Sequence, residues 1–394
     1  MDILYKLDNY RVCHPRETWD RIYPILSEIG VRGIERIDHL DRLGIPVYAV
    51  ERIGEEGIVY HLGKGTTDIQ AKVSGSMEAI ERYSAELKEE DRKRLKEKPE
   101  NPVDIRELVL PLDIYRYLGE RKSIRGIQWI EGFDVINECT LEVPAEGVFH
   151  PYRGKLFRSN TNGIASGNNL YEAILHGALE VIERDAWSIA ELSGNTYRRI
   201  EIEGAKNPLI HELLERFESA NINVILKDLT SEVGIPTVGA VCDEEVWKDP
   251  ALLCIGVGCH LHPEIAVIRA LTEVAQSRST QLHSRGKSSL RGDIVRRIGY
   301  ERMKRIHRRW YEYREVIGIE DMENCARYNL RRDLKTVEEK LIEGGFDKLI
   351  YVDLKKGEVD TVRVIIPKME VYSMDRDRIS PWAKERIRKI RSIR

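Results

Sequence analysis

Three glutamates at helical spacing are the residues whose types and positions most clearly suggest chemistry in this chain. Apolar residues from Leu170 to Ala190 recur with the period of an amphipathic helix, and at about 100° per residue Glu172, Glu180 and Glu183 fall within one narrow arc. No Lys or Arg lies between them on that arc, although like charges at this spacing destabilise a helix by ~0.2–0.5 kcal/mol per pair. Carboxylate ligands favour hard cations, so the stripe indicates bound Mg²⁺ or Ca²⁺, with a solvated helix face as the alternative.

The same arc carries His176 and follows a polar loop. His176 is a candidate general base, and packing or hydrogen bonding is the alternative role for this histidine. The preceding residues 157–169 are rich in Asn, Gly, Ser and Thr, which favour tight turns with exposed backbone N–H groups. A polar loop directly before a carboxylate stripe supports the metal interpretation.

A second group of polar residues follows the turn at residues 63–65. This turn leads into a helix whose N-cap is Thr66 or Thr67. It is not a P-loop, because the required spacing of glycines and lysine is missing. One face of the helix carries Ser74, Glu78, Glu81 and Arg82. Surface charge is the alternative interpretation of this face.

A third helix is expected over residues 262–282. Arg269, Glu273 and Gln276 share one of its faces, whereas Arg278 falls on the far side of an ideal helix. Three distant segments therefore each offer a carboxylate on a helix face.

Composition excludes several classes of function. The 394 residues include 63 Lys and Arg against 66 Asp and Glu, so the net charge of −3 gives no electrostatic case for nucleic-acid binding. The first ten residues contain no apolar segment typical of a signal peptide, and no apolar run approaches the length of a membrane span. We therefore expect a soluble, cytoplasmic protein.

The six cysteines are scattered along the chain without a CxxC pair. Cys254 and Cys259, together with His260 and His262, could form a zinc site, but their spacing is irregular and no second ligand pair lies nearby. Buried free thiols in a reducing compartment are the favoured interpretation.

The order of apolar segments predicts a mixed α+β protein in which amphipathic helices pack on β-sheets. Beyond the helices already described, we expect helices at 15–29, 209–220 and 292–317, and strands within 126–149, 223–260 and 348–372. Length alone allows two or three domains or one large mixed domain.

The chain resembles the YcaO family from about residue 63 to residue 379. Four segments carry the resemblance: GKG with SGSMEAIERY, TNGIASGNNLYEAILHGALEVIERDAW, GVGCHLHPEIAVIRALTEVAQSR and VRVIIPKMEVYS. The resemblance implies one YcaO domain over residues 1–394. Its expected parts are an N-terminal α/β part (1–62), an ATP- and Mg²⁺-binding core (63–290) and a C-terminal part with charged helices and strands (291–394).

The family binds ATP with Mg²⁺ held by glutamates, in a site between helices. By resemblance, the metal ligands are Glu78, Glu81, Glu180 and Glu183. The nucleotide or phosphate contacts implied by the resemblance are Lys64, Ser74, Arg82, Asn168, Glu172, Glu273 and Arg278. The assignment of Arg278 conflicts with its position on the far side of the helix.

The family activates a peptide backbone amide, and the nucleophile that follows determines the product. Azoline-forming members typically end in a Pro-rich tail and act with a peptide-binding module. This chain ends ISPWAKERIRKIRSIR, which favours the thioamide branch and external sulfide. It most resembles stand-alone members from methanogenic archaea, which implies a homodimer, a glycine of the methyl-coenzyme M reductase alpha subunit as substrate, and a TfuA-type partner. An azoline-forming cyclodehydratase, and an ATP-binding accessory protein for ribosomal-protein methylthiolation, are the alternatives.

Overall fold

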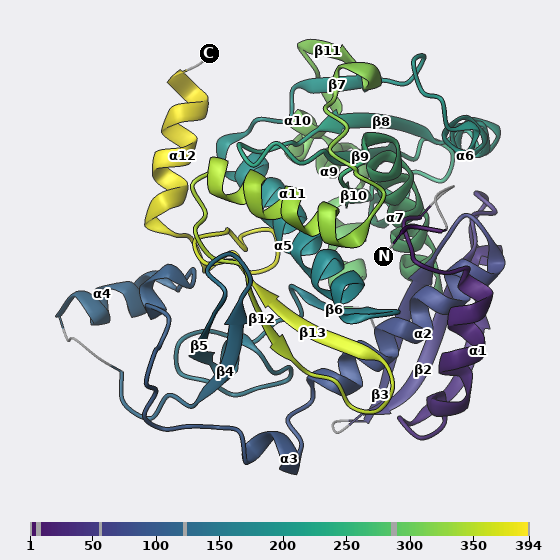
Figure 1. Cartoon of the computed structure of the whole chain (residues 1–394). Helices are drawn as coiled ribbons and strands as arrows, with labels where there is room; N and C mark the ends of the chain where they lie inside the picture. Colours follow the sequence, from purple (N-terminus) through teal and green to yellow (C-terminus); the bar gives the residue numbers. More distant parts are fainter. Residues whose placement is uncertain (1, 5–8, 55–56, 121–123, 285–289, 393–394) are drawn as a thin grey trace.

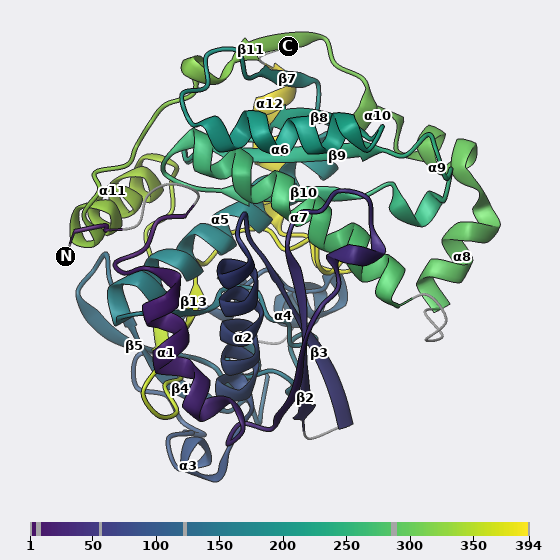
Figure 2. The ribbon, with the colours of Figure 1, turned by 90° about the vertical axis from the view of Figure 1, so that its right-hand side faces the viewer.

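The computed structural model describes residues 2–4, 9–54, 57–120, 124–284 and 290–392, and it contains three β-sheets covered by helices (Figure 1). The first sheet has the order β1-β2-β3 and is antiparallel. Its strands are β1 (Val31–Arg36), β2 (Val47–Gly54) and β3 (Gly57–Lys64). Figure 2 shows α1 (Pro15–Leu26) and α2 (Asp68–Ala85) side by side, and α2 packs against β2 and β3.

A glycine allows α2 to lie directly on β3. A Cβ atom added at Gly63 would come within 2.1 Å of the backbone nitrogen of Gly75, in the middle of α2. Such an approach is possible only where the strand residue has no side chain. The N-cap of α2 is Thr67, one of the two expected positions. This close packing fixes the helix face that carries Glu78 and Glu81.

The second sheet has the order β10-β9-β8-β7-β11 and lies in the upper half of Figure 1. Its strands are β7 (Arg198–Glu201), β8 (Asn223–Asp228), β9 (Thr237–Asp243), β10 (Ile255–Cys259) and β11 (Glu315–Gly318). One face is covered by α6 (Pro208–Ser219) and α7 (Pro263–His283), and the other by α5 (Leu170–Ser193). Every residue of β9 is buried because helices pack on both of its faces.

The third sheet has the order β5-β4-β12-β13-β6 and joins segments that are distant in the sequence. Its strands are β4 (Trp129–Asp134), β5 (Cys139–Pro144), β6 (Ile164–Gly167), β12 (Ile350–Asp353) and β13 (Asp360–Ile365). The sheet therefore combines strands from the expected core with strands from the expected C-terminal part.

Helix α5 runs between the second and third sheets near the centre of the molecule (Figure 1). The side chain of Asn169 caps its N-terminus by accepting from the backbone N–H of Glu172, and Gly194 ends it with φ 72°. The helix packs on β6 and β13 on one side and on β9 and β10 on the other. The predicted helix at 170–190 is thus confirmed, and burial on two sides makes its position rigid.

The remaining helices connect these sheets. They are α3 (Glu89–Arg92), α4 (Leu112–Glu120), α8 (Leu290–Ile298), α9 (Tyr300–Ile306), α10 (Arg308–Tyr311), α11 (Leu330–Glu343) and α12 (Pro381–Ser392). The 3-10 turns are η1 (Asp38–Leu40), η2 (Ile105–Glu107), η3 (Ala145–Gly147), η4 (Pro250–Leu252) and η5 (Ile319–Asp321). The last two residues of the basic C-terminal run, 393–394, lie outside the described residues.

The mixed helix-and-sheet fold predicted from the sequence is confirmed. The expectation of a charged helix or helix pair over 292–317 is wrong, because this segment forms three short helices and strand β11. Gly299, with φ 84°, ends α8, and β11 pairs in parallel with β7. Within the described ranges, no helix is long and apolar enough to cross a membrane.

Candidate nucleotide and metal site

A cavity of about 520 Å³ is lined by residues of α2, α5 and α7. These three helices lie near the centre of Figure 2. The C-terminal end of β3 and the segment before α1 complete its walls. Six carboxylates line it: Glu78, Glu81, Glu172, Glu180, Glu183 and Glu273. The three helix faces proposed from the sequence therefore converge on one cavity of the size that small-molecule sites usually have.

The cavity also contains most of the other residues singled out in the sequence. Lys64, Ser74, Arg82, Asn168 and His176 all line it. Because helices buried between sheets carry most of these side chains, their relative positions are fixed by packing.

Two glutamates of α2 face Arg82. One guanidinium nitrogen, Nη2, lies 3.4 Å from Oε1 of Glu78, and Nη1 lies 4.0 Å from Oε2 of Glu81. Oε1 of Glu81 accepts hydrogen bonds from the backbone N–H and the hydroxyl of Ser166, at 2.9 and 2.7 Å. Hydrogen bonds from β6 therefore hold Oε1 of Glu81 in place. The other oxygen, Oε2, is the one near Arg82.

Glu183 and Glu273 share a second cationic residue. The backbone N–H of Cys259 donates to Oε2 of Glu183 at 3.0 Å, and Nη2 of Arg184 lies 3.4 Å from Oε1 of Glu183 and 3.9 Å from Oε1 of Glu273. Lys64 donates to Oε2 of Glu273 at 2.6 Å.

By contrast, the carboxylate of Glu180 makes no hydrogen bond or ion pair with any residue that the structure describes. Its carboxylate is free to bind a ligand in the cavity.

Burial changes the protonation of this cluster. It raises the pKa of Glu81 to about 7 and that of Glu183 to about 7, and Arg82 and Arg184 counteract this only in part. Burial also acts to raise the pKa of Glu273, but Lys64 and Arg184 outweigh it and hold that pKa below its ordinary value. A bound metal ion would favour the ionised form of Glu81 and Glu183. The cluster is therefore suited to binding a cation.

Several donors in the cavity have unmade hydrogen bonds. Nη1 of Arg82, Nε of Arg184 and Nε of Arg269 are buried and have no acceptor among the described residues. Buried guanidinium N–H groups are costly unless they are paired, and phosphate oxygens are suitable acceptors. Carboxylates for a cation and guanidinium groups for an anion therefore line the same cavity.

The donor set fits Mg²⁺ bound together with a polyphosphate. Among the described residues, no three His, Cys, Asp or Glu side chains form a complete metal site by themselves. Mg²⁺ is usually held by one or two carboxylates and by substrate phosphates, so a complete protein cage is not needed. Glu180, which has no partner among the described residues, and Glu78 and Glu81 on α2 line the cavity and could contribute such ligands.

Glu172 and Asn168 mainly hold the cavity wall together. Glu172 accepts from the backbone N–H of Val12 at 3.0 Å and from the side-chain amide of Asn168 at 2.9 Å, and it lies 3.3 Å from Nη1 of Arg11. Asn168 in turn accepts from the hydroxyl of Thr18 at 2.9 Å. These bonds attach the segment before α1 to the N-terminal end of α5.

His176 is present in the cavity as a neutral imidazole. Burial, reinforced by the charges of Arg11 and Arg269, holds its pKa well below its ordinary value. Its Nδ1 atom is buried without a hydrogen-bond partner in the described part of the chain. A neutral nitrogen can accept a proton, so the candidate role as general base stays a prediction.

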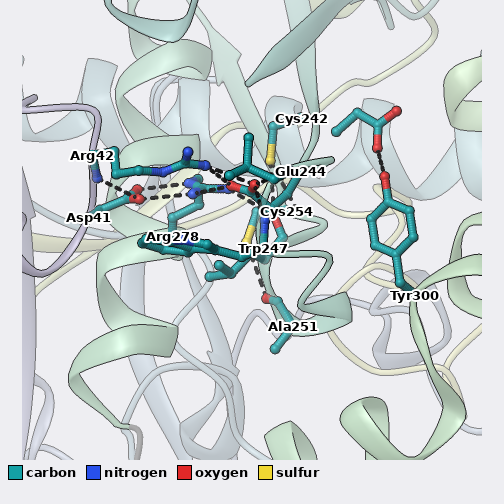
Figure 3. A network of polar contacts seen from close by, with 12 residues as sticks. Asp41, Arg42, Cys242, Glu244, Trp247, Ala251, Cys254, Arg278 and Tyr300 are labelled. Carbon is teal, nitrogen blue, oxygen red and sulfur yellow. Dashed lines mark hydrogen bonds and ion pairs between the residues drawn. The ribbon is translucent and has the colours of Figure 1, made fainter. Parts of the chain in front are cut away.

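Arg278 corrects the assignment made by resemblance. Its guanidinium is fully buried outside the cavity and donates to Asp41 at 2.7 and 2.8 Å and to Glu244 at 2.8 Å (Figure 3). This places it on the side of α7 opposite Glu273, as helical geometry requires for residues five positions apart. The expected nucleotide contact at Arg278 is therefore wrong.

The zinc alternative is also wrong. Cys254 and Cys259 pack in different hydrophobic clusters, and no metal-binding group that includes them occurs among the described residues. All six cysteines are free thiols, and four of them are buried, as expected.

The sequence alone missed Arg11, Arg184 and Ser166 as cavity residues and noted Arg269 without giving it a role. Arg184 directly follows Glu183, and Arg269 lies one helical turn before Glu273, so helical spacing could have indicated both. Arg11 and Ser166 contact Glu172 and Glu81 from distant segments, and local pattern carries no signal for such contacts.

The cavity between the helices combines carboxylates suited to a metal ion with guanidinium groups suited to a polyphosphate. A sequence model of the family described as YcaO cyclodehydratase, ATP- and Mg²⁺-binding, matches residues 62–370. The chain belongs to the YcaO family, whose members bind ATP and Mg²⁺.

Two relatives match nearly the whole chain. A protein of Methanothermobacter thermautotrophicus is 46% identical over 376 residues, which cover 93% of this chain and 96% of the relative. A protein of Rhizobium leguminosarum bv. trifolii, named for its location in the tfuA 3' region, is 29% identical over 92% of this chain and 89% of its own.

Two solved structures share the fold. YcaO from Methanopyrus kandleri bound with AMPPCP and Mg²⁺ is 34% identical, with a TM-score of 0.81 over 96% of this chain and 97% of that chain. A heterocyclase in complex with substrate and cofactor has a TM-score of 0.77 at 20% identity, over 94% of this chain but 54% of that chain.

Proposed function

We propose that this protein is an ATP-dependent thioamidase that acts on a peptide backbone. In the overall reaction a backbone amide, ATP and sulfide give a thioamide, ADP and phosphate. The amide oxygen leaves as part of the phosphate, and sulfur takes its place on carbon. Phosphorylation is required because an amide carbon is a poor electrophile and its oxygen a poor leaving group.

The observation that carries this proposal is the coexistence, in one cavity, of carboxylates and of guanidinium groups that each keep an N–H without an acceptor among the described residues. We assign Mg²⁺ to Glu78, Glu81, Glu180 and Glu183. When bound, Mg²⁺ and ATP supply a neutralised, transferable phosphoryl group. The protein itself positions the reactants and stabilises the developing charge.

Cationic side chains are assigned to the phosphates. Arg82, Arg184 and Arg269 each have an N–H group without an acceptor in the described part of the chain. Lys64, which is bonded to Glu273, is a further cation in the cavity. The hydroxyl of Ser74 lies in the same cavity. Asn168 and Glu172 support the nucleotide indirectly, because their hydrogen bonds hold the cavity wall.

Sulfide as the external nucleophile is supported by the relatives. This chain and the Methanopyrus kandleri YcaO cover each other almost completely, whereas this chain spans about half of the heterocyclase. Both methanogen relatives support the proposal that the substrate is a glycine of the methyl-coenzyme M reductase alpha subunit. The location of the Rhizobium relative's gene supports a TfuA-type partner that supplies sulfur, and we retain a cytoplasmic homodimer as part of the proposal.

One observation favours a second function. The family description names a cyclodehydratase, in which a neighbouring Cys, Ser or Thr side chain attacks the activated amide and water is lost. Mass spectrometry of peptides incubated with the protein, ATP, Mg²⁺ and sulfide distinguishes the possibilities. Exchange of oxygen for sulfur at a glycine supports the thioamidase, and loss of water at Cys, Ser or Thr supports the cyclodehydratase. If no peptide changes although ATP binds, an accessory protein replaces both.

A further inference from the structure

Cys242 lies near the end of β9, and Cys254 directly precedes β10, its antiparallel neighbour. Strand β9 pairs with β10 so that Val241 faces Ile255, and the same register places Cys242 opposite Cys254. The backbone N–H of Cys242 donates to the carbonyl of Cys254 at 3.0 Å. Opposed residues in an antiparallel pair have Cα atoms ~4.5–5.5 Å apart, and a disulfide spans ~4.4–6.8 Å. The backbone is therefore already placed for a covalent link.

The sulfur of Cys242 both accepts and donates a hydrogen bond. The backbone N–H of Cys254 donates to this sulfur at 3.3 Å, and Figure 3 shows both cysteines beside the ion pairs of Arg278. The guanidinium of Arg278 also donates to the carbonyl of Leu252 at 3.4 Å, the same oxygen that accepts from the Cys242 thiol at 3.2 Å. The N–H of Cys254 favours a thiolate at Cys242, whereas the Leu252 carbonyl favours the thiol. Asp41 and Glu244 balance the charge of the nearby Arg278.

The two thiols differ in acidity. A hydrogen bond from the Cys254 thiol, together with the charge of Arg278, holds the pKa of Cys242 below its ordinary value in spite of burial. The same hydrogen bond and burial raise the pKa of Cys254. By comparison, burial raises the pKa of Cys259, the last residue of β10, to about 12. The lower pKa favours Cys242 as the thiol that reacts first.

The pair lies next to a surface connection. Residues 245–248, which join β9 to η4, are exposed, and Val246 and Trp247 are among the exposed large hydrophobic residues. Local opening of such a connection is less costly than unfolding the strands. Cys254 itself is 8% exposed. Cys242 is fully buried, so access of a small oxidant to the pair requires this connection to open while both strands stay folded.

We infer that Cys242 and Cys254 form a redox-active dithiol that a peroxide converts to an intrachain disulfide, which links β9 to β10 beneath α7. The thiolate of Cys242 attacks one peroxide oxygen, the O–O bond breaks and hydroxide leaves, so that Cys242 becomes a sulfenic acid. The sulfur of Cys254 then attacks the Cys242 sulfur and displaces hydroxide. The two hydroxides take up the two thiol protons, so two thiols are oxidised and one peroxide becomes two waters.

The test uses the full-length protein, reduced and then freed of reductant. After treatment with hydrogen peroxide and alkylation of remaining thiols, peptide mass spectrometry should find Cys242 joined to Cys254, with the intact mass lower by two hydrogens. The oxidised protein should melt at a higher temperature than the reduced protein, and dithiothreitol should reverse this, because a disulfide restricts the unfolded chain.

Two variants serve as the matched pair. The Cys325→Ser variant removes another buried thiol and should keep the disulfide. Cys254→Ser should lose it and accumulate a sulfenic acid at Cys242 that dimedone traps. The inference is overturned if exposed Cys139 is fully oxidised in the wild type while Cys242 and Cys254 are still alkylated after unfolding, or if the disulfide maps to other cysteines.

Discussion

Lys64 donates a hydrogen bond to Glu273 at 2.6 Å, although the two residues are 209 positions apart in the chain. Lys64 ends β3 and Glu273 lies in the middle of α7, so the bond joins two walls of the cavity. The Lys64 charge is the main reason why the pKa of Glu273 stays low despite burial. This ion pair links the first sheet to the helix that covers the second.

Replacement of Lys64 by Gln should weaken Mg-ATP binding by at least about tenfold, or ~1.4 kcal/mol, because a cation near the phosphates is lost. Isothermal calorimetry measures this directly. A double-mutant cycle with Glu273→Gln on unfolding free energy should give a coupling of ~0.5–3 kcal/mol. If the affinity for Mg-ATP is unchanged and the coupling energy with Glu273 is zero, Lys64 does not contribute to the site.

Removal of a metal ligand from α5 should abolish tight nucleotide binding without unfolding the protein. In Glu180→Gln and Glu183→Gln a ligand charge is lost, and Mg²⁺ affinity depends on the number and geometry of charged ligands. Calorimetry with Mg-ATP should show at least a tenfold loss in each variant, while Glu215→Gln, at an exposed position on α6, retains wild-type affinity. Wild-type affinity in both α5 variants contradicts the metal assignment.

The carboxylates of α2 should lower the stability of the metal-free protein. Replacement of Glu78 or Glu81 by Gln removes charge from a crowded acidic cluster, so we expect a higher melting temperature without ligand and a loss of ATP turnover. Differential scanning calorimetry without Mg²⁺ and an assay of ADP release measure the two effects. A Glu78→Gln variant with wild-type turnover and an unchanged melting temperature would return this helix face to ordinary surface charge.

The raised pKa of Glu81 has a defined effect on stability. The folded protein holds the proton up to about pH 7, whereas the unfolded chain releases it near pH 4.5. Between these values the folded state binds more protons, so this residue lowers the unfolding free energy as the pH rises, by at most ~3.5 kcal/mol at ~1.4 kcal/mol per unit. Histidines such as His61, whose pKa is lowered to about 3 by burial, change stability in the opposite direction. The comparison must therefore be made between variant and wild type.

Denaturant unfolding of the metal-free protein at pH 5.5 and pH 7.5 makes this comparison. The stability gained by Glu81→Gln should be larger at pH 7.5 than at pH 5.5, and saturating Mg-ATP should reverse the order of the two proteins. A gain that is equal at both pH values would show that Glu81 is ionised throughout.

Arg278 should matter for folding and not for nucleotide binding. Its guanidinium is fully buried between Asp41 and Glu244, and removal of one partner from a buried ion pair costs ~3–5 kcal/mol. Arg278→Lys should therefore unfold at lower denaturant concentration but bind Mg-ATP normally while folded. If this variant loses affinity for Mg-ATP but keeps wild-type stability, Arg278 does contact the nucleotide.

The parts that the sequence predicted well are those with local signals. Asn169 and Gly194 mark the two ends of α5, and helical spacing alone placed Glu180 and Glu183 on one face. Burial between two sheets then brought this face to the cavity, as the pattern required.

The parts that it did not predict depend on distant segments. The contact of Arg11 with Glu172 joins residues 161 positions apart, and the pairing of β4 with β12 joins residues near 134 and 350. The segment 292–317 is rich in helix-forming residues, yet β11 forms there because β7 offers a free edge. Contacts between distant segments decide the structure at such positions. The burial of Arg278 against Asp41 and Glu244 is another example.

The central claim is that the amide oxygen leaves on phosphate and is replaced by sulfur. A peptide from methyl-coenzyme M reductase with ¹⁸O in the target glycine carbonyl tests this most directly. After incubation with the protein, ATP, Mg²⁺ and sulfide, the released phosphate should carry the ¹⁸O label, and the glycine should carry sulfur in its place. Unlabelled phosphate, or label that stays in the peptide while ATP is consumed, would contradict the account.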